Sequence, residues 1–361
     1  MQHDTQNPRR KKQIWWLAII FISLATIYSI IYYSNHNKQN IIRPLTFGQS
    51  EGPVISLPTP TPIPFYELTI PYLRQRKYSS NLGELEKVSE HQNYKSYVTS
   101  YDSDGLRING LLTMPQGERP ASGWPAIVFV HGYIPPQNYQ TTQNYVSYVD
   151  YIARNGFVVF KIDLRGHADS EGEAGGGYYS SDYIIDTLNA SAALASSDFV
   201  NPDKIGLWGH SMAGNVIFRS FVAKGDIAAV AIWSGAVYSY IDFQEYSIDD
   251  NSYQPPPRDS EQVRKRRELF EKYGQFDAES EFWKQVVPTN YLDGLKGAVQ
   301  VNHAINDNVV SIQYSRNLMK ILDSTSIPHE LHEYSSGGHN LTGSTFTQAM
   351  QRTVDFFRRN L

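Results

Sequence analysis

The sequence predicts an α/β fold, with a mostly parallel β-sheet covered by helices on both faces, and one transmembrane helix in front of it. Apolar runs such as 126–130 and 157–162 lack the alternation of half-exposed strands, so they are typical of strands buried on both faces. Helix-length segments separate these runs, and such an alternation indicates a parallel sheet. The expected crossover helices are residues 145–154, 182–195, 215–223, 314–322 and 345–359, and residues 105–114 are expected to form an early strand.

The six-residue stretch 209–214, of sequence GHSMAG, lies between a predicted strand, 204–208, and the predicted helix 215–223. A strand, a sharp turn and a helix with a serine at the apex form a nucleophile elbow, which exposes the serine hydroxyl above the sheet. Small flanking residues prevent collisions in such a turn, and Ala213 replaces the glycine that usually stands two residues after the serine. The pattern therefore predicts that Ser211 is a nucleophile.

Two further polar residues each follow a predicted strand. Asp307 comes after the apolar run 297–301, and His339 comes in a glycine-rich loop after the run 329–334. The chain order Ser211, Asp307, His339 is the order that α/β-hydrolases use. A serine hydroxyl needs an imidazole to take its proton, and the imidazole needs a carboxylate to orient it. The three residues are therefore predicted to form a catalytic triad.

Each of these residues taken alone has an ordinary structural interpretation. Asp307 is also typical of a turn or a helix cap, and His339 of a solvated loop. Their order and their positions after strands favour the triad. Asp242, which follows the predicted strand 228–233 and its loop, is the alternative acid, with a weaker strand context.

The buried run 126–130 leads into His131, Gly132 and Tyr133. In an α/β-hydrolase the oxyanion hole combines the backbone amide after the nucleophile with an amide from this earlier loop. The sequence therefore predicts the N–H groups of Tyr133 and Met212 as the oxyanion donors.

Several polar residues near these motifs have structural interpretations. His131 is expected to hydrogen-bond within its own turn, and His210 to pack beneath the elbow. Asp163 and Arg165 are expected to form an ion pair that ties their loop near the elbow. The basic run 264–267 is expected on a solvated helix face rather than at an anion site.

From about residue 97 to residue 361, the chain resembles the catalytic domain of the prolyl oligopeptidase family and its esterase relatives. The stretches that carry the resemblance are 101–105 (YDSDG), 128–132 (VFVHG), 163–172 (DLRGHADSEG), 209–214, 290–293 (NYLD) and the loops of Asp307 and His339.

This resemblance implies an α/β-hydrolase fold and a serine triad that works through an acyl-enzyme, without a cofactor. It leaves both a peptide bond and an ester as the scissile bond. Peptidases of the family usually carry a β-propeller before the hydrolase domain, whereas only a short stretch precedes it here. That stretch contains no tandem glutamates of the kind that bind a substrate amino terminus in the family's dipeptidyl peptidases.

Composition agrees with a globular enzyme, because 361 residues with 41% hydrophobic content can build a large core. The chain contains no cysteine, which excludes disulfides and thiolate metal sites. A formal net charge of −4 and the lack of a basic groove motif argue against a nucleic-acid partner. The histidines are scattered, so no metal site is predicted.

Residues 14–33, from Ile14 to Tyr33, form an uncharged and mostly apolar run. About 20 helical residues span the roughly 30 Å hydrocarbon core of a bilayer. The run is longer than the apolar region of a cleaved signal peptide and lacks a small-residue cleavage site, so an uncleaved anchor is predicted. The basic residues 9–12 are expected to keep the tail, 1–13, in the cytoplasm, which places the rest of the chain outside.

Residues 34–64 are rich in Pro, Thr and Asn and are expected to form an extended stalk between the anchor and the hydrolase. The hydrolase domain is then 65–361. Within it, residues 81–91 are expected to form a helix packed on the core. Residues 238–287 interrupt the strand–helix alternation and are expected to form a cap over the active site.

The sequence thus predicts a membrane-anchored serine hydrolase, facing outward, that resembles serine peptidases and acts on a small-molecule ester or peptide. A carboxylesterase is the alternative within the same chemistry. A non-catalytic binding module on a stalk is the alternative from another class, although all three triad members are present. The oligomeric state is left open.

Overall fold

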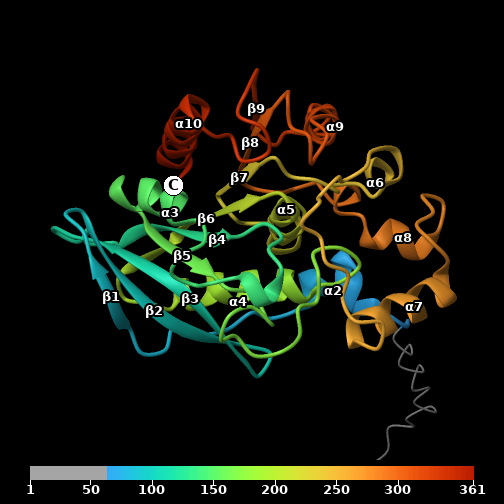
Figure 1. Ribbon diagram of the computed structural model, residues 1–361, viewed down its shortest axis with the longest axis horizontal. Helices are drawn as coiled ribbons and strands as arrows, with labels where there is room; N and C mark the ends of the chain where they lie inside the picture. The colour runs from blue at the N-terminus through green and yellow to red at the C-terminus, as the bar shows by residue number, and fades with distance from the viewer. Residues whose placement is uncertain (1–62) are drawn as a thin grey trace, which may run out of the picture. The chain divides into compact units, whose positions relative to one another are not determined.

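A nine-stranded β-sheet forms the centre of the part of the chain that the computed structural model describes, residues 63–361. The strand order is β1-β2-β3-β5-β4-β6-β7-β8-β9 (Figure 1). Strands β4 to β9 pair in parallel, whereas β1, β2 and β3 pair antiparallel, and β3 joins β5 antiparallel. The strands are β1 (Glu86–Glu90), β2 (Tyr94–Ser103), β3 (Leu106–Pro115), β4 (Trp124–Val130), β5 (Val158–Ile162), β6 (Val200–His210), β7 (Ala229–Trp233), β8 (Ala298–Ala304) and β9 (His329–Tyr334).

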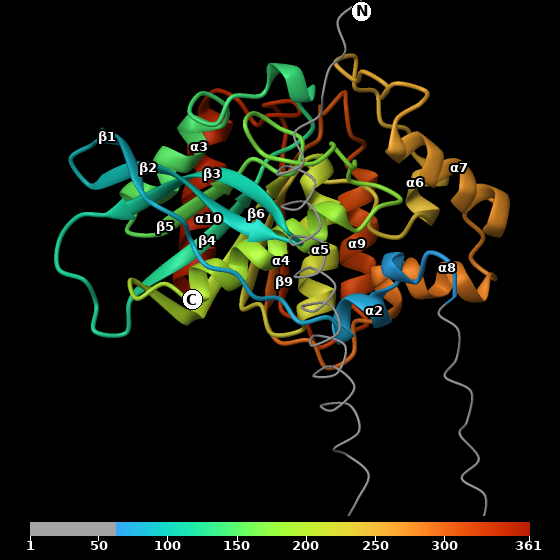
Figure 2. The same cartoon turned by 90° about the horizontal axis from the view of Figure 1, so that it is seen from below.

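Helices cover both faces of the sheet (Figures 1 and 2). One apolar cluster joins α3 and α10 to one face, and a larger cluster joins α4, α5 and α9 to the other. The helices are α2 (Ile70–Gln75), α3 (Val146–Arg154), α4 (Asp182–Ala195), α5 (Met212–Lys224), α6 (Ile241–Glu245), α7 (Glu261–Tyr273), α8 (Glu281–Val286), α9 (Gln313–Leu322) and α10 (Ser344–Asn360), with short 3₁₀ turns at Tyr66–Leu68, Pro136–Asn138 and Pro288–Asn290.

The central strands are mostly apolar because neither face of the sheet reaches water, although β5 carries the buried Lys161. Every residue of β5 and of β7 is buried. The predicted α/β-hydrolase fold, with its mostly parallel sheet covered by helices on both faces, is therefore confirmed. Helix α4 has the predicted bounds, and α5 begins at Met212, three residues before the predicted start.

The prediction of a helix over residues 81–91 is wrong. Leu82 forms an isolated bridge to Tyr101, and β1 follows as an edge strand paired with β2. Most side chains of β1 are exposed, so local apolar periodicity carries little information there. The backbone donors and acceptors that β2 presents at the sheet edge decide the conformation of this segment.

The segment 238–287 contains α6, α7 and α8 and lies between β7 and β8. The basic run 264–267 is exposed on α7, as the solvated interpretation requires, and Lys265 pairs there with Glu261 one turn earlier.

The predicted tail and anchor, 1–13 and 14–33, lie outside the described residues, as does the predicted stalk up to residue 62. Within 63–361, none of the helices combines the length and the apolar character that crossing a bilayer requires.

Candidate active site

Ser211 lies at a sharp turn between the end of β6 and the start of α5. Its backbone has φ 56° and ψ −121°. Residues other than glycine rarely adopt this conformation, which costs about 1–3 kcal/mol. The turn is held by hydrogen bonds from Ser211 N to Trp233 O (2.9 Å) and from Gly214 N to Ser211 O (2.8 Å). A β-carbon on Gly214 would lie 2.7 Å from the Cα of Gly235, so this position requires glycine.

Asp307 and His339 meet at the carboxyl ends of β8 and β9, the two strands that precede them. His339 Nδ1 lies 2.8 Å from Asp307 Oδ2, and the Asp307 side chain is fully buried. The other carboxylate oxygen, Oδ1, accepts from the backbone amides of Val309 (2.8 Å) and Val310 (3.0 Å). The carboxylate is therefore held by its own loop, and one oxygen faces the imidazole of His339.

A second histidine, which was not among the residues predicted from the sequence, contacts the same carboxylate. His303, at the end of β8, is fully buried, and its Nε2 lies 3.1 Å from Asp307 Oδ2 and 3.1 Å from Val310 O. Since both neighbours are acceptors, Nε2 carries the proton, and Nδ1 then accepts from the hydroxyl of Ser315 at 2.7 Å.

The two histidines set the charge state of the acid. Burial alone would raise the pKa of Asp307, but the hydrogen bonds from His303 and His339 outweigh it and hold that pKa well below its usual range. Asp307 therefore stays ionised at any ordinary pH. Only the spacing of four residues between His303 and Asp307, with a strand end between them, pointed to this contact in the sequence.

The predicted oxyanion residues come from two segments next to the nucleophile. Tyr133 follows β4 and lines the same pocket as Ser211, while Met212 is the first residue of α5, where an amide has no intrahelical partner. His131 is buried, and its ring contacts Gly132 O and Asp163 O, as the structural interpretation of this residue predicted.

His210 connects the oxyanion loop to the His339 loop. Its Nδ1 lies 2.7 Å from the hydroxyl of Tyr145, and that hydroxyl accepts from the amide of Gly132 at 3.0 Å. The remaining nitrogen, Nε2, lies 3.0 Å from the carbonyl oxygen of His339 and therefore carries the proton. Tyr145 carried no motif in the sequence, and the fold alone brings it to the site.

The two buried histidines His131 and His210 should make the protein labile to acid. Burial lowers the pKa of each to about 3, whereas an unfolded histidine binds a proton below about 6.5. Because the unfolded state then binds more protons, the free energy of unfolding should fall as pH falls from 6.5 toward 3. The expected slope is up to about 1.4 kcal/mol per pH unit for each histidine.

Urea unfolding at a series of pH values measures this slope. His210→Gln should remove the contribution of one of the two histidines from the slope. An unchanged slope in His210→Gln would show that this histidine is already protonated in the folded protein.

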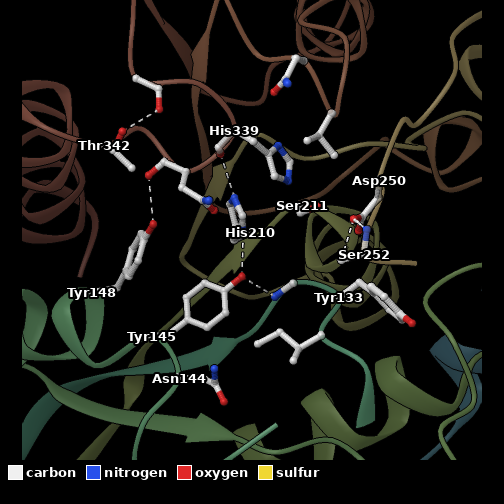
Figure 3. Close-up of a pocket in the computed structure, with 16 residues that line it drawn as sticks. Tyr133, Asn144, Tyr145, Tyr148, His210, Ser211, Asp250, Ser252, His339 and Thr342 are labelled. Atoms are coloured by element: carbon white, nitrogen blue, oxygen red, sulfur yellow. Dashed lines mark hydrogen bonds between the residues drawn. The ribbon is translucent and has the colours of Figure 1, made fainter. Parts of the chain in front are cut away.

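A pocket of about 690 Å³ opens beside Ser211 and His339 (Figure 3). It is lined by Gly132, Tyr133, Ile134, Asn144, Tyr145, Tyr148, His210, Ser211, Asp250, Ser252, Asn308, Val309, Gly337, His339, Asn340 and Thr342. Asp250 and Ser252 come from the segment 238–287, so this insertion contributes to the wall of the pocket.

Two further residues that the sequence singled out, Asp242 and Asp163, have partners other than those considered there. Asp242 Oδ1 accepts from Asn317 Nδ2 at 3.0 Å, and within residues 63–361 no hydrogen bond or ion pair joins Asp242 to His339. The predicted ion pair between Asp163 and Arg165 is wrong.

Arg165 instead pairs with Asp186 (2.7 Å) and Asp182 (3.1 Å) on α4. The Asp163 carboxylate accepts from Tyr139 (2.9 Å) and Thr141 (2.5 Å). Leu164, which lies between Asp163 and Arg165, has a positive φ of 60°, so the chain turns sharply after β5 and the two side chains contact different partners. Asp163 and its partners thereby anchor the far end of the loop that carries Tyr133.

In the described part of the chain, no three His, Cys, Asp or Glu side chains gather in an arrangement that suits a metal ion.

Comparison with known proteins gives a family and a fold. The model of the prolyl oligopeptidase family matches residues 143–361. The chain is 30% identical over 154 residues to dipeptidyl peptidase 8 of Mus musculus, which covers 40% of this chain and 17% of that protein. It is 24% identical over 258 residues to the uncharacterized peptidase YtmA of Bacillus subtilis, which covers 70% of this chain and 88% of the relative.

Among solved structures, the acetyl xylan esterase from Paenibacillus sp. R4 has a TM-score of 0.57 at 16% identity, over 81% of this chain and 92% of the esterase. At that identity the likeness shows the fold alone. The chain spans less than a fifth of the length of dipeptidyl peptidase 8.

Proposed function

The chain belongs to the prolyl oligopeptidase family and is a serine hydrolase, and on that premise we propose that Ser211, His339 and Asp307 form its catalytic triad. The observation that carries the proposal is the 2.8 Å contact between His339 Nδ1 and Asp307 Oδ2, at the pocket that Ser211 and His339 both line. The strained turn at Ser211 also favours this role, because such strain gathers at functional residues.

The protons can be followed through the reaction. His339 donates its Nδ1–H to Asp307, which leaves Nε2 as the base that takes the proton of the Ser211 hydroxyl. The serine oxygen adds to the substrate carbonyl, and His339 then gives the proton to the leaving group. A water molecule attacks the acyl-enzyme with the same histidine as base, and Ser211 regains its proton as the acid product leaves.

We also propose the amides of Tyr133 and Met212 as the donors to the tetrahedral oxyanion. Each preorganised donor of this kind stabilises the transition state by about 3–4 kcal/mol. Two networks support the placement of Tyr133 within its loop. The hydroxyl of Tyr145 holds Gly132 on one side, and Asp163 holds Tyr139 and Thr141 on the other.

For the substrate, we propose a peptide bond, in keeping with the family. Amines are poorer leaving groups than alcohols, so a triad that cleaves an amide also cleaves esters of the same acyl group. The second candidate is a carboxylesterase. It is favoured by the pocket lining, which among residues 63–361 includes no pair of glutamates of the kind that holds a substrate amino terminus in the family's dipeptidyl peptidases.

A paired panel of substrates separates the two candidates. The full-length protein should hydrolyse both short-chain p-nitrophenyl esters and aminoacyl or dipeptidyl p-nitroanilides, with kcat/KM measured for each. Turnover of esters without any anilide cleavage would identify a carboxylesterase. Absence of turnover with every member, together with absence of labelling by a fluorophosphonate, would favour the non-catalytic binding module.

We further propose that residues 14–33 anchor the enzyme in a membrane with the hydrolase domain outside. Four basic residues at 9–12 precede the run, and the next lysine or arginine after it is Lys38, so the positive charge lies mostly on the amino-terminal side.

Protease added to intact cells or spheroplasts should cut within 34–64 and release an active soluble fragment. Complete protection of the hydrolase domain in intact cells would contradict this orientation. Mature protein that already lacks 14–33 would point to a cleaved signal peptide instead.

A further inference from the structure

The active-site pocket contains a carboxylate that the proposed reaction does not use. Asp250 lines the pocket together with Ser211 and His339, and among the described residues no lysine or arginine lines it. Asp250 forms no ion pair with any group in 63–361. The histidine next to the nucleophile contributes no compensating charge, because burial lowers the pKa of His210 to about 3. The pocket therefore has one negative charge without a counter-charge.

The carboxylate is held so that one oxygen remains available. Asp250 Oδ1 accepts both the amide (2.8 Å) and the hydroxyl (2.6 Å) of Ser252. Within 63–361, no hydrogen bond reaches Oδ2. The turn therefore needs only Oδ1, and an asparagine would supply that acceptor equally well. The negative charge at this position has no structural purpose in the turn.

The strap that carries Asp250, residues 248–254, is fixed at both ends. At one end, Asp249 N donates to Val309 O at 2.9 Å, next to the Asp307 loop. At the other end, the Tyr133 hydroxyl accepts from Gln254 N (2.9 Å) and donates to Gln254 O (3.2 Å). The strap thus spans from the loop of the proposed acid to the loop of the proposed oxyanion donor, and its position does not depend on a substrate.

We propose that Asp250 binds a cationic group, an ammonium or a guanidinium, in the acyl part of the substrate. This inference rests on the proposed function and names a substrate class for it. A carboxylate in a partly enclosed pocket attracts a cation more strongly than one in open water. At the end of the strap near Tyr133, the rings of Tyr133 and Tyr253 lie with their centroids 5.4 Å apart. Cations bind favourably over aromatic faces of this kind.

The position of Asp250 assigns the cation to the acyl part. The leaving group must face His339, which gives it a proton. In Figure 3, Asp250 lies across Ser211 from His210 and on the side of Tyr133, whose amide is the proposed oxyanion donor. A group that extends from the carbonyl carbon away from His339 therefore extends toward Asp250.

Two esters with the same leaving group test the proposal. Nα-benzoyl-arginine ethyl ester carries a guanidinium, and Nα-benzoyl-citrulline ethyl ester carries a neutral urea of nearly the same shape. For the full-length protein, kcat/KM should be about two- to fivefold higher for the arginine ester, a difference of the size expected for a partly exposed charge pair. Asp250→Asn should bring the ratio of the two values close to one. High salt should lower the ratio of the unmodified protein as well.

Asp249→Asn is the matched control, because it removes the same charge at the neighbouring residue. The Asp249 side chain is exposed and does not line the pocket. It should leave the ratio unchanged. Thermal unfolding of both variants checks that the strap stays folded.

Three outcomes would overturn the inference. The first is that the unmodified protein shows no preference for the arginine ester. This includes the case in which a fluorophosphonate labels the protein but the protein does not hydrolyse this ester. The second is a preference that survives in Asp250→Asn. The third is equal loss of the preference in Asp249→Asn, which would indicate a general field effect. In these cases the proposed serine chemistry stands, whereas a lack of both labelling and hydrolysis would overturn that chemistry too.

Discussion

Replacing Ser211 with alanine should lower kcat by about a millionfold and abolish covalent labelling by a fluorophosphonate. In the proposed mechanism the change removes the atom that forms the acyl bond, so His339 and Asp307 cannot compensate. The fold should persist, because alanine occupies less space than serine in the buried turn and the backbone bonds of the turn remain. Gel fluorescence after labelling measures the loss of the nucleophile, and thermal unfolding checks separately that the fold persists.

Ser234→Ala is a suitable control for this experiment. Ser234 is also buried, also has a positive φ (47°), and its hydroxyl has no hydrogen-bond partner within residues 63–361. Its replacement should leave labelling and turnover nearly unchanged. If Ser211→Ala were still labelled at full intensity, Ser211 would not be the nucleophile.

Asp307→Asn should lower kcat by about 10⁴-fold with little change in the affinity for substrate. The carboxylate holds the proton of His339 on Nδ1, and an asparagine amide that donates there would favour the wrong tautomer. His303 amplifies this effect, because its Nε2–H needs an acceptor at the same position. Steady-state kinetics with an activated ester measure the loss.

Asp242→Asn tests the alternative acid in the same assay. Asp242 accepts from Asn317 and contributes no contact to His339 among the residues described, so its replacement should cost far less activity. A large loss in Asp242→Asn with a small loss in Asp307→Asn would move the assignment of the acid to Asp242.

Some features of this protein follow from local sequence. The apolar strands β5 and β7 and helix α4 were predictable because their burial produces runs and periodicities that a short window reveals. The strand–turn–helix context of Ser211 was predictable for the same reason. The edge strand β1 was not, because its exposed side chains leave no apolar pattern and its conformation depends on pairing with β2.

By itself, the sequence determined the fold class and named Ser211, Asp307 and His339 as a set, since each follows an element with a strong local signal. Only the tertiary structure decided what surrounds them. Tyr145 reaches His210 from 65 residues away, and Tyr133 holds the strap of Asp250 from 121 residues away. Such contacts depend on the register of the sheet and on the path of the loops. No periodicity encodes either of these, because the residues involved are polar, single and far apart in the chain.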